Sequence, residues 1–380
     1  MFTRFTAWKA ALLAVLVMAL AVPPSSIRAF AEQEGPQKAP PDPQSQGQQR
    51  PTVDPNQKQK RPEYSIQVES PLVQVDAVVT DQDGNILTGL KKENFRVAED
   101  GEPQQITNFS PTDAPITVVM LMEFSKLGYS IFAYTAKYWA TDFISHLKKE
   151  DWLAFKTFDM KTHLEVDFTQ NKQDVQQAIY QLYFPGFSEA NLFDALVETL
   201  DEMKDVKGKK AILVMCSGLD TFSKHTLDQT LKIVKQTDVT IFGVGVAQQL
   251  AEYADARGQL GAIDRMNFLQ GQNQLSTFAR MTGGYAWYPQ FDGQIPEIFE
   301  TVAQFLRNQY TIGFIPTNQN NDGKYHKLKV EVVDDSGQPL IITNAKGKKR
   351  KIVIYAREGF TAPTGAVSAL PQGGPSRSGY

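Results

Sequence analysis

The sequence has 380 residues, of which 42% are hydrophobic and 21% charged, and its net charge is −3. This composition predicts a globular protein of two or three domains, and the mild acidity argues against a nucleic-acid-binding surface. Because Cys216 is the single cysteine, an internal disulfide is excluded and the fold must depend on its hydrophobic cores.

Residues 1–31 have the pattern of a signal peptide. Arg4 and Lys9 precede an apolar run from Ala10 to Val22, which is shorter than a typical membrane span, and "AFA" offers small residues for cleavage. We therefore expect export to the periplasm or the extracellular space, with no membrane span after cleavage. An uncleaved signal would instead tether the protein to a membrane.

Residues 32–63 are rich in Pro and Gln and predict a disordered tether. From residue 64 to 110 the hydrophobic period becomes two, in "LVQVDAVV" and "FRVAEDGEPQQITNF". Turn signals follow at Asp83-Gly84 and Asp100-Gly101. This segment predicts an all-β unit of about four strands, which needs further strands to close a core.

Residues 115–308 alternate strands and helices. The predicted strands are "ITVVMLME", "DWLAFKTFD", "THLEVDF", "KAILVMCS", "VTIFGVGV" and "GGYAWYP", and the predicted helices cover residues 129–149, 172–183, 192–204, 224–237, 274–281 and 294–308. This order predicts an α/β fold, a mostly parallel sheet with helices on both faces. The second and third strands are too close for a helix between them, so we expect a hairpin and one antiparallel edge. We expect residues 248–274 to form a long loop, either a lid or partner loop or a variable surface insertion.

Residues 309–362 return to period two, in "NQYTIGFIP", "YHKLKVEVV" and "KKRKIVIYAREGF". Since neither β segment closes a core alone, we expect one β-sandwich built from residues 64–110 and 309–362. The α/β domain is then inserted between its halves. Residues 363–380 are rich in Gly, Pro and Ser and predict a disordered tail.

The stretch "ITVVMLMEFSKLGYS" ends a buried strand on Glu123, and Ser125 follows two residues later. An acid-x-Ser at a strand end, in an α/β unit with this hairpin, resembles the von Willebrand factor A domain, a Rossmann-like fold. The order of "VDAVVTDQDGNILTGLKKENFRVAEDGEPQQITNFS", the α/β unit and "LRNQYTIGFIPTN" is similar to acidobacterial von Willebrand factor A-related proteins. The resemblance covers residues 64–363 and implies an A domain flanked by a β-sandwich-like region.

The resemblance also implies a metal ion-dependent adhesion site, built from Asp-x-Ser-x-Ser, a Thr and a further Asp. Seven residues fall at or beside its positions: Glu123, Ser125, Leu127, Ala190, Asn191, Ser217 and Asp220. Ser125 matches and Glu123 is one methylene longer than Asp, whereas Leu127 and Ala190 offer no side-chain oxygen and Ser217 replaces an Asp. Hard cations such as Mg²⁺ and Ca²⁺ need several oxygen ligands. The implied site is therefore degenerate, with Glu123, Ser125 and Asp220 as weak metal candidates.

These features predict an exported, non-enzymatic protein-binding or adhesion module. Its A domain would use the face at the strand ends to bind a protein partner without a functional metal or other cofactor. One alternative is a divalent-metal-dependent adhesion module with altered ligands: Glu123, Ser125, Asn191 and Asp220. In a third interpretation, Glu123 and Ser125 are merely solvent-facing loop residues.

An enzyme is a further alternative. Ser217 and His225 both follow the fourth strand of the α/β unit, but the sequence has no G-x-S-x-G motif to support a nucleophile. The four histidines are scattered, with no i, i+4 pair and no nearby cysteine, which argues against a zinc site.

Overall fold

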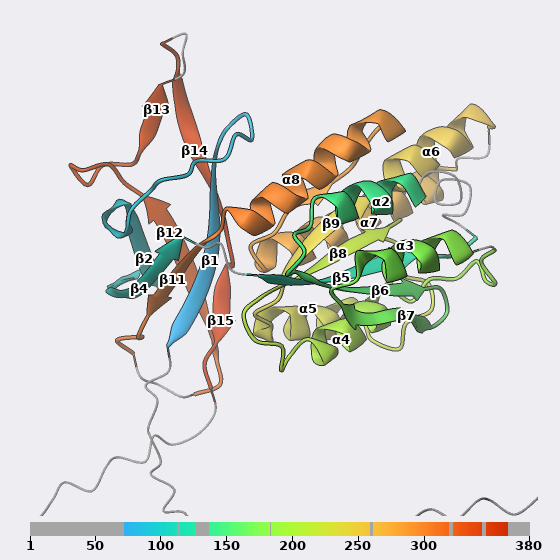
Figure 1. Ribbon diagram of the computed structural model, residues 1–380, viewed down its shortest axis with the longest axis horizontal. Coiled ribbons are helices and arrows are strands. Elements are labelled where there is room, and N and C mark those ends of the chain that lie inside the picture. The colour runs from blue at the N-terminus through green and yellow to red at the C-terminus, as the bar shows by residue number, and fades with distance from the viewer. Residues whose placement is uncertain are drawn as a thin grey trace, which may run out of the picture. The chain divides into compact units, whose positions relative to one another are not determined.

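The computed structural model describes residues 72–111, 115–126, 137–182, 184–258, 261–318, 322–343 and 347–363. The predicted signal peptide, tether and tail lie outside these residues, as does Leu127. The described chain forms an α/β unit around a six-stranded sheet and a β-rich region of two further sheets (Figure 1).

The six-stranded sheet has the order β10-β9-β8-β5-β6-β7. Its strands are β5 (Ile116–Glu123), β6 (Trp152–Phe158), β7 (Thr162–Thr169), β8 (Lys209–Cys216), β9 (Thr240–Gly245) and β10 (Ala286–Trp287). Every neighbouring pair is parallel except β6 and β7, which confirms the predicted hairpin and antiparallel edge.

Helices cover both faces of this sheet, so its central strands are buried on both sides. In β5, Val118 and Met120 belong to one core, whereas Val119 and Leu121 belong to the other. Figure 1 shows α2, α3 and α8 over one face and α4 and α5 over the other. The helices are α2 (Lys137–Ser145), α3 (Lys172–Gln181), α4 (Leu192–Glu202), α5 (Leu227–Gln236), α6 (Ala247–Ala256), α7 (Ala262–Met281) and α8 (Ile295–Arg307).

We predicted a loop at residues 248–274, and this prediction is wrong because most of the segment is helical. It forms nearly all of α6 and residues 262–274 of α7. Gly271 lies inside α7 at a close approach to Gly218. A Cβ atom at position 271 would come within 2.9 Å of the Gly218 carbonyl group. The glycine therefore serves packing between α7 and the loop after β8.

The β-rich region combines strands from both flanks of the α/β unit. A five-stranded sheet has the order β13-β14-β1-β11-β4, and a four-stranded sheet has the order β15-β12-β2-β3. The N-terminal strands are β1 (Val73–Asp81), β2 (Phe95–Glu99), β3 (Glu102–Gln104) and β4 (Ile106–Pro111). The C-terminal strands are β11 (Tyr310–Phe314), β12 (Tyr325–Val332), β13 (Ile341–Thr343), β14 (Lys349–Ala356) and β15 (Gly359–Thr361).

Both sheets contribute to one hydrophobic core. Val75 and Ile312 come from the five-stranded sheet, and Val97 and Leu328 come from the four-stranded sheet. The expected pairing of the two β segments is therefore confirmed, while the domain boundaries stay predictions. No helix in the described ranges is both long and apolar enough to cross a lipid bilayer.

Candidate functional site

Glu123 is the last residue of β5 and lies at the carboxyl edge of the parallel sheet. The register pairs Glu123 with Phe158 of β6 and Met122 with Met215 of β8. Because neighbouring parallel strands end at the same edge, the loop that follows β8 begins beside the Glu123 side chain. Two residues after Met215, that loop supplies Ser217.

Three hydrogen bonds occupy the Glu123 carboxylate. The Ser125 hydroxyl donates to Oε1 over 2.6 Å, and the Ser217 backbone N–H and hydroxyl both donate to Oε2 over 2.7 Å. Both oxygens are thus satisfied by donors from the chain itself.

The Glu123 and Ser125 side chains are fully buried, so the interpretation of solvent-facing loop residues is wrong. Burial raises the pKa of the Glu123 carboxyl group, while the hydrogen bonds from Ser125 and Ser217 oppose this rise. Ser217, which the sequence resemblance aligns with an Asp of the family's metal site, donates two hydrogen bonds to Glu123 here.

The Asp220 carboxylate holds the start of α4, beside the N-cap residue Asn191. Asp220 Oδ1 accepts hydrogen bonds from the Phe193 N–H over 3.0 Å and from the Ser223 hydroxyl over 2.5 Å, and burial raises the pKa of Asp220. A carboxylate at a helix N-terminus is favourable because it satisfies a free N–H group and complements the helix dipole. Asn191, the N-cap residue, is buried, and its Oδ1 has no hydrogen-bond partner among the described residues.

Ala190 is also buried and fixes two loops together through its backbone. Its N–H donates to the Thr221 hydroxyl over 2.9 Å, and its carbonyl oxygen accepts from the Thr221 N–H over 2.8 Å. The structure therefore brings Glu123, Ser125 and Ser217 into direct contact. Asp220 instead hydrogen-bonds to the start of α4, away from the carboxylate of Glu123.

Ser217 and His225, the nucleophile pair considered from the sequence, hydrogen-bond to different residues. The His225 ring Nδ1 lies 2.6 Å from Asp194 Oδ1, and Asp194 also accepts from the Lys224 and His225 N–H groups. Burial disfavours the Asp194 carboxylate, but these hydrogen bonds outweigh it and lower the pKa. Ser217 is bonded to Glu123, and in the described ranges no hydrogen bond joins Ser217 to His225.

Exposed apolar side chains stand on the loops and the helix around this edge. We call them the strand-end surface: Phe187, Phe222, Ile263, Met266 and Leu269, which are all at least half exposed. The Phe187 carbonyl oxygen accepts from the Lys126 N–H over 2.7 Å, and the Phe222 N–H donates to the Ala190 carbonyl oxygen over 3.1 Å. These bonds connect two of the aromatic residues to the loops that hold Ser125 and Asn191.

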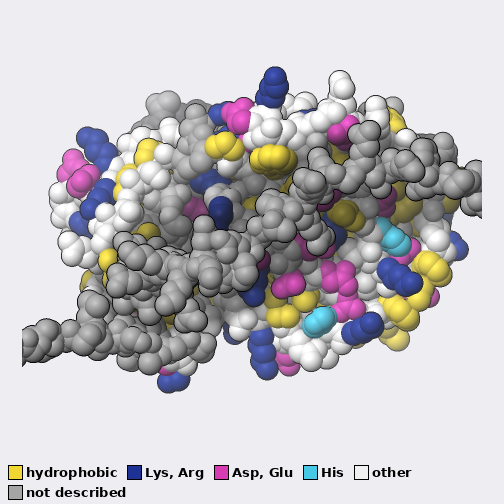
Figure 2. All heavy atoms as spheres, turned by 60° about the horizontal axis from the view of Figure 1, so that its bottom comes forward, with side chains coloured by type: hydrophobic (Ala, Val, Ile, Leu, Met, Phe, Trp, Pro, Cys, Tyr) yellow, Lys and Arg dark blue, Asp and Glu magenta, His cyan; other side chains and the backbone are white. Residues whose placement is uncertain are grey.

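A small hollow of about 190 Å³ lies beside these residues, between α7 and the loop after β8. It is lined by Leu219, Asp220, Thr221, Asn267, Gln270, Gly271 and Gln274. Sequence reasoning missed the contribution of α7 because it assigned this segment to a loop. The available signal was the spacing of Phe268, Leu275 and Phe278, which lie at i, i+7 and i+10 and are buried on one face of α7. On the face drawn in Figure 2, hydrophobic side chains lie in separate groups among acidic and basic ones.

Residues 118–273 match the model of the von Willebrand factor type A domain family. This match covers most of β5, all of β6 to β9, the helices α2 to α6 and more than half of α7, whereas β10 and α8 follow it. The α/β unit therefore contains a von Willebrand factor type A domain, and the chain has an additional β-rich region. No curated protein matches the sequence.

Several solved structures are similar to about half of the chain. Proximal thread matrix protein 1 from the mussel byssus is 12% identical with a TM-score of 0.39, over 52% of this chain and 49% of that chain. The hypothetical protein BatB from Bacteroides thetaiotaomicron is 12% identical with a TM-score of 0.34, over 50% and 98%. The vWF domain of the pilus tip protein Mfa5 from Porphyromonas gingivalis is 13% identical with a TM-score of 0.33, over 51% and 95%. None of these similarities bears on what this chain binds.

Proposed function

We propose that the von Willebrand factor type A domain of this chain is a non-enzymatic protein-binding module. It binds its partner through the strand-end surface, without a metal ion between the two proteins. The observation that supports this most directly is the Glu123 carboxylate, which is buried and hydrogen-bonded to Ser125 and Ser217 on both oxygens. A carboxylate in this state has no oxygen directed at solvent, where a bridging metal would meet the partner.

The strand-end surface supplies an alternative means of binding. Exposed aromatic and aliphatic side chains, with a polar hollow beside them, are typical of protein interfaces in which a few apolar residues contribute most of the affinity. Phe187 and Phe222 are held by backbone hydrogen bonds of their loops, and the other three lie on one helix. The partner we propose is therefore a protein with a complementary apolar surface.

The same proposal includes the setting of the protein. We propose that residues 1–31 direct export to the periplasm or cell exterior, where residues 32–63 act as a spacer, and that the chain belongs to the acidobacterial von Willebrand factor A-related proteins. The basis for export is the pattern of two early positive charges, a short apolar run and small residues near Ala31. Detection of the mature N-terminus by mass spectrometry tests this part directly.

The binding proposal is tested with a pair of matched variants. The full chain is cross-linked in the exported fraction, a captured partner is identified and purified, and its affinity is then measured. Met266→Glu combined with Leu269→Glu is expected to weaken binding at least tenfold. Leu164→Glu, a similarly exposed leucine on β7, is expected to leave the affinity unchanged.

Metal dependence is tested in the same measurement. Affinity is expected to be equal in EDTA and in millimolar Mg²⁺ or Ca²⁺. Loss of binding in EDTA that returns with metal would establish the metal-dependent alternative. Equal affinity for wild type and for the charged variant on α7 would contradict the strand-end surface as the binding site.

A further inference from the structure

Three ionisable side chains gather in the β-rich region, away from the strand-end surface. Glu99 is the last residue of β2, Asp100 follows in the turn, and His326 lies near the start of β12. The His326 ring Nδ1 is 2.9 Å from Asp100 Oδ2 and 3.2 Å from Glu99 Oε1. In the part of the chain that the structure describes, this is the one group of three such residues with all ligand atoms within 4.8 Å.

The fold holds these groups in place. Asp100 has a positive φ of 49° and is followed by Gly101 at 95°, a turn that suits Asp-Gly between two antiparallel strands. Asp100 Oδ1 accepts from the Lys327 N–H over 2.8 Å, which leaves Oδ2 directed at the imidazole. On the other side the His326 ring stacks on Phe360, with ring centroids 5.5 Å apart.

Two buried polar atoms of the cluster have no hydrogen-bond partner among the described residues. They are Glu99 Oε2 and His326 Nε2, on side chains that are 97% and about 92% buried. A buried carboxylate oxygen without a partner is destabilising, and it is a rare feature of native proteins. A proton on Nδ1 satisfies the two carboxylate oxygens that face it, but it leaves Glu99 Oε2 unsatisfied.

A metal ion bound to His326 Nδ1 accounts for the carboxylate oxygens of the cluster, whereas Nε2 lies on the opposite side of the ring and does not reach that ion. Distances of 2.9 and 3.2 Å between ligand atoms match an ion about 2.0–2.2 Å from each of them, and the ion can also accept the second oxygen of Glu99. His326 Nε2 lies 3.5 Å from Asp322 Oδ1, so a carboxylate faces the far side of the ring. A carboxylate in this position orients many metal-binding histidines.

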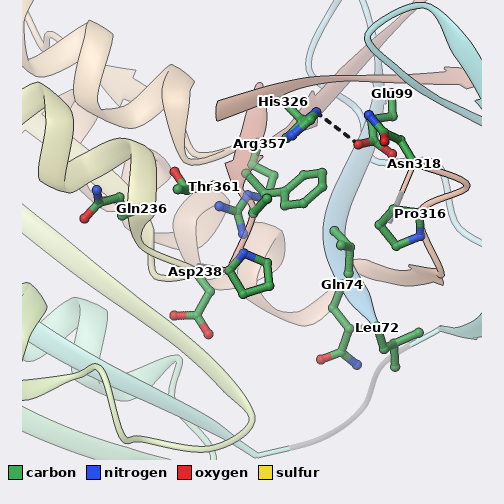
Figure 3. A pocket seen from close by; sticks show the side chains of 14 residues that line it. Leu72, Gln74, Glu99, Gln236, Asp238, Pro316, Asn318, His326, Arg357 and Thr361 are labelled. Carbon is green, nitrogen blue, oxygen red and sulfur yellow. Dashed lines mark ion pairs between the residues drawn. The ribbon is translucent and has the colours of Figure 1, made fainter. Parts of the chain in front are cut away.

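The cluster is also accessible. Glu99 and His326 line a pocket of about 290 Å³ together with Asn318, Arg357 and Asp238 (Figure 3). The Arg357 side chain is held in place, because its Nε and Nη2 donate to the carbonyl oxygens of Gly359 and Thr237. Water or a further ligand can therefore reach the open position of a bound ion through this pocket.

We propose that Glu99, Asp100 and His326 form a binding site for a divalent transition metal of the Zn²⁺ class. A set of one imidazole and two carboxylates favours Zn²⁺, Co²⁺ or Mn²⁺ over Mg²⁺ and Ca²⁺, which prefer oxygen ligands alone. This site is separate from the strand-end surface. The metal-binding test and the partner-binding test can therefore fail independently of each other.

The test uses the full chain, purified without a histidine tag and freed of metal with EDTA. Isothermal titration calorimetry with ZnCl₂ at pH 7.5 is expected to show one site, and a saturating excess should raise Tm by several degrees. Co²⁺, used as a coloured probe, is expected to give visible absorption that saturates at one equivalent.

Four variants locate the site. Glu99→Gln and His326→Asn are each expected to abolish binding, and Asp322→Asn should weaken it about 10–100-fold. Glu99→Gln nearly preserves the shape of the side chain. It therefore still tests the site if the His326→Asn variant does not fold. His163→Asn is the control, because His163 also lies beside a carboxylate, 3.3 Å from Asp159, but on a half-exposed side chain. This variant should bind as wild type.

Three results would overturn the proposal. One is a folded wild type that shows neither binding heat nor a Tm shift with Zn²⁺, Co²⁺ or Mn²⁺. Another is wild-type affinity in both Glu99→Gln and His326→Asn. The third is loss of binding in His163→Asn.

Discussion

Ser217→Ala tests whether the chain itself satisfies the buried carboxylate of Glu123. The substitution removes the hydroxyl that donates to Glu123 Oε2 over 2.7 Å and leaves the backbone N–H in place. A hydrogen bond to a charged group contributes about 1.5–3 kcal/mol. The Leu219 N–H also loses an acceptor, at 3.2 Å. We therefore expect the free energy of unfolding to fall by about 2–3 kcal/mol.

This loss corresponds to a decrease in Tm of about 4–12 °C for a unit of about 150–250 residues, the size of the α/β unit. Urea unfolding at pH 7 measures it directly, and the m-value shows whether the unfolded state has changed. Ser145→Ala is the matched control, because its hydroxyl donates to the Asp142 carbonyl oxygen at the exposed end of α2. The free energy of unfolding of that variant is expected to lie within about 0.5 kcal/mol of the wild-type value.

The effect also has a predictable pH dependence. Burial raises the folded-state pKa of Glu123 above 4.5, so the contribution of this group to stability is fully present below pH 4.5 and is lost as pH rises through the folded-state pKa. Ser217→Ala raises that pKa further, so its cost should be larger at pH 7 than at pH 4. If Ser217→Ala and Ser145→Ala change the free energy of unfolding equally at both pH values, the hydrogen-bonded arrangement of Glu123 and Ser217 is refuted.

Two further substitutions test other parts of the chain. Burial lowers the pKa of Lys209 from 10.5 to about 8, so its charge opposes folding below pH 8 and stability should rise between pH 8 and 10.5. Lys209→Met is expected to stabilise the protein at pH 7 by up to about 3 kcal/mol, and a lower urea midpoint there would contradict this. Gly218→Ala places a Cβ atom 2.7 Å from the Gly271 carbonyl oxygen at a φ of 80° and should cost about 1–3 kcal/mol. In thermal melts Gly186→Ala, with its nearest neighbour at 3.9 Å, should resemble wild type, and equal melts for both glycine variants would argue against the close packing of α7.

Much of the fold follows from local sequence pattern. Val118 to Met122 form an unbroken apolar run because β5 is buried on both faces, and this run identified a parallel sheet. The helices in residues 248–274 were missed for a physical reason. Their N-cap residues, Val246 and Gly261, make no side-chain cap hydrogen bond, so the sequence has no Ser, Thr, Asp or Asn at these positions to indicate where the helices begin.

The site was predictable only in part. Glu123 and Ser125 are close in sequence, so their proximity was visible, whereas the bond from Ser217 depends on the register between β5 and β8. The cluster at His326 was invisible for the same reason. Glu99 and Asp100 read as a turn, and the antiparallel register of β2 and β12 alone brings the histidine to them.

The pairing of β1 with β11 and β14 sets the order in which the protein can be completed during synthesis. Val73 pairs with Phe314, and Val79 pairs with Ile354, so the first strand to emerge must wait for partners that follow the whole A domain. The six-stranded sheet has no such requirement, since its strands are contiguous along the chain. The A domain can therefore form while β1 and β4 are still unpaired and β2 pairs with β3 alone. Contacts between distant parts of a chain form slowly, and unpaired strand edges promote aggregation. The nascent chain is therefore most prone to aggregation while the edges of these early strands are exposed. This period ends only when β14 has been synthesised and can pair with β1.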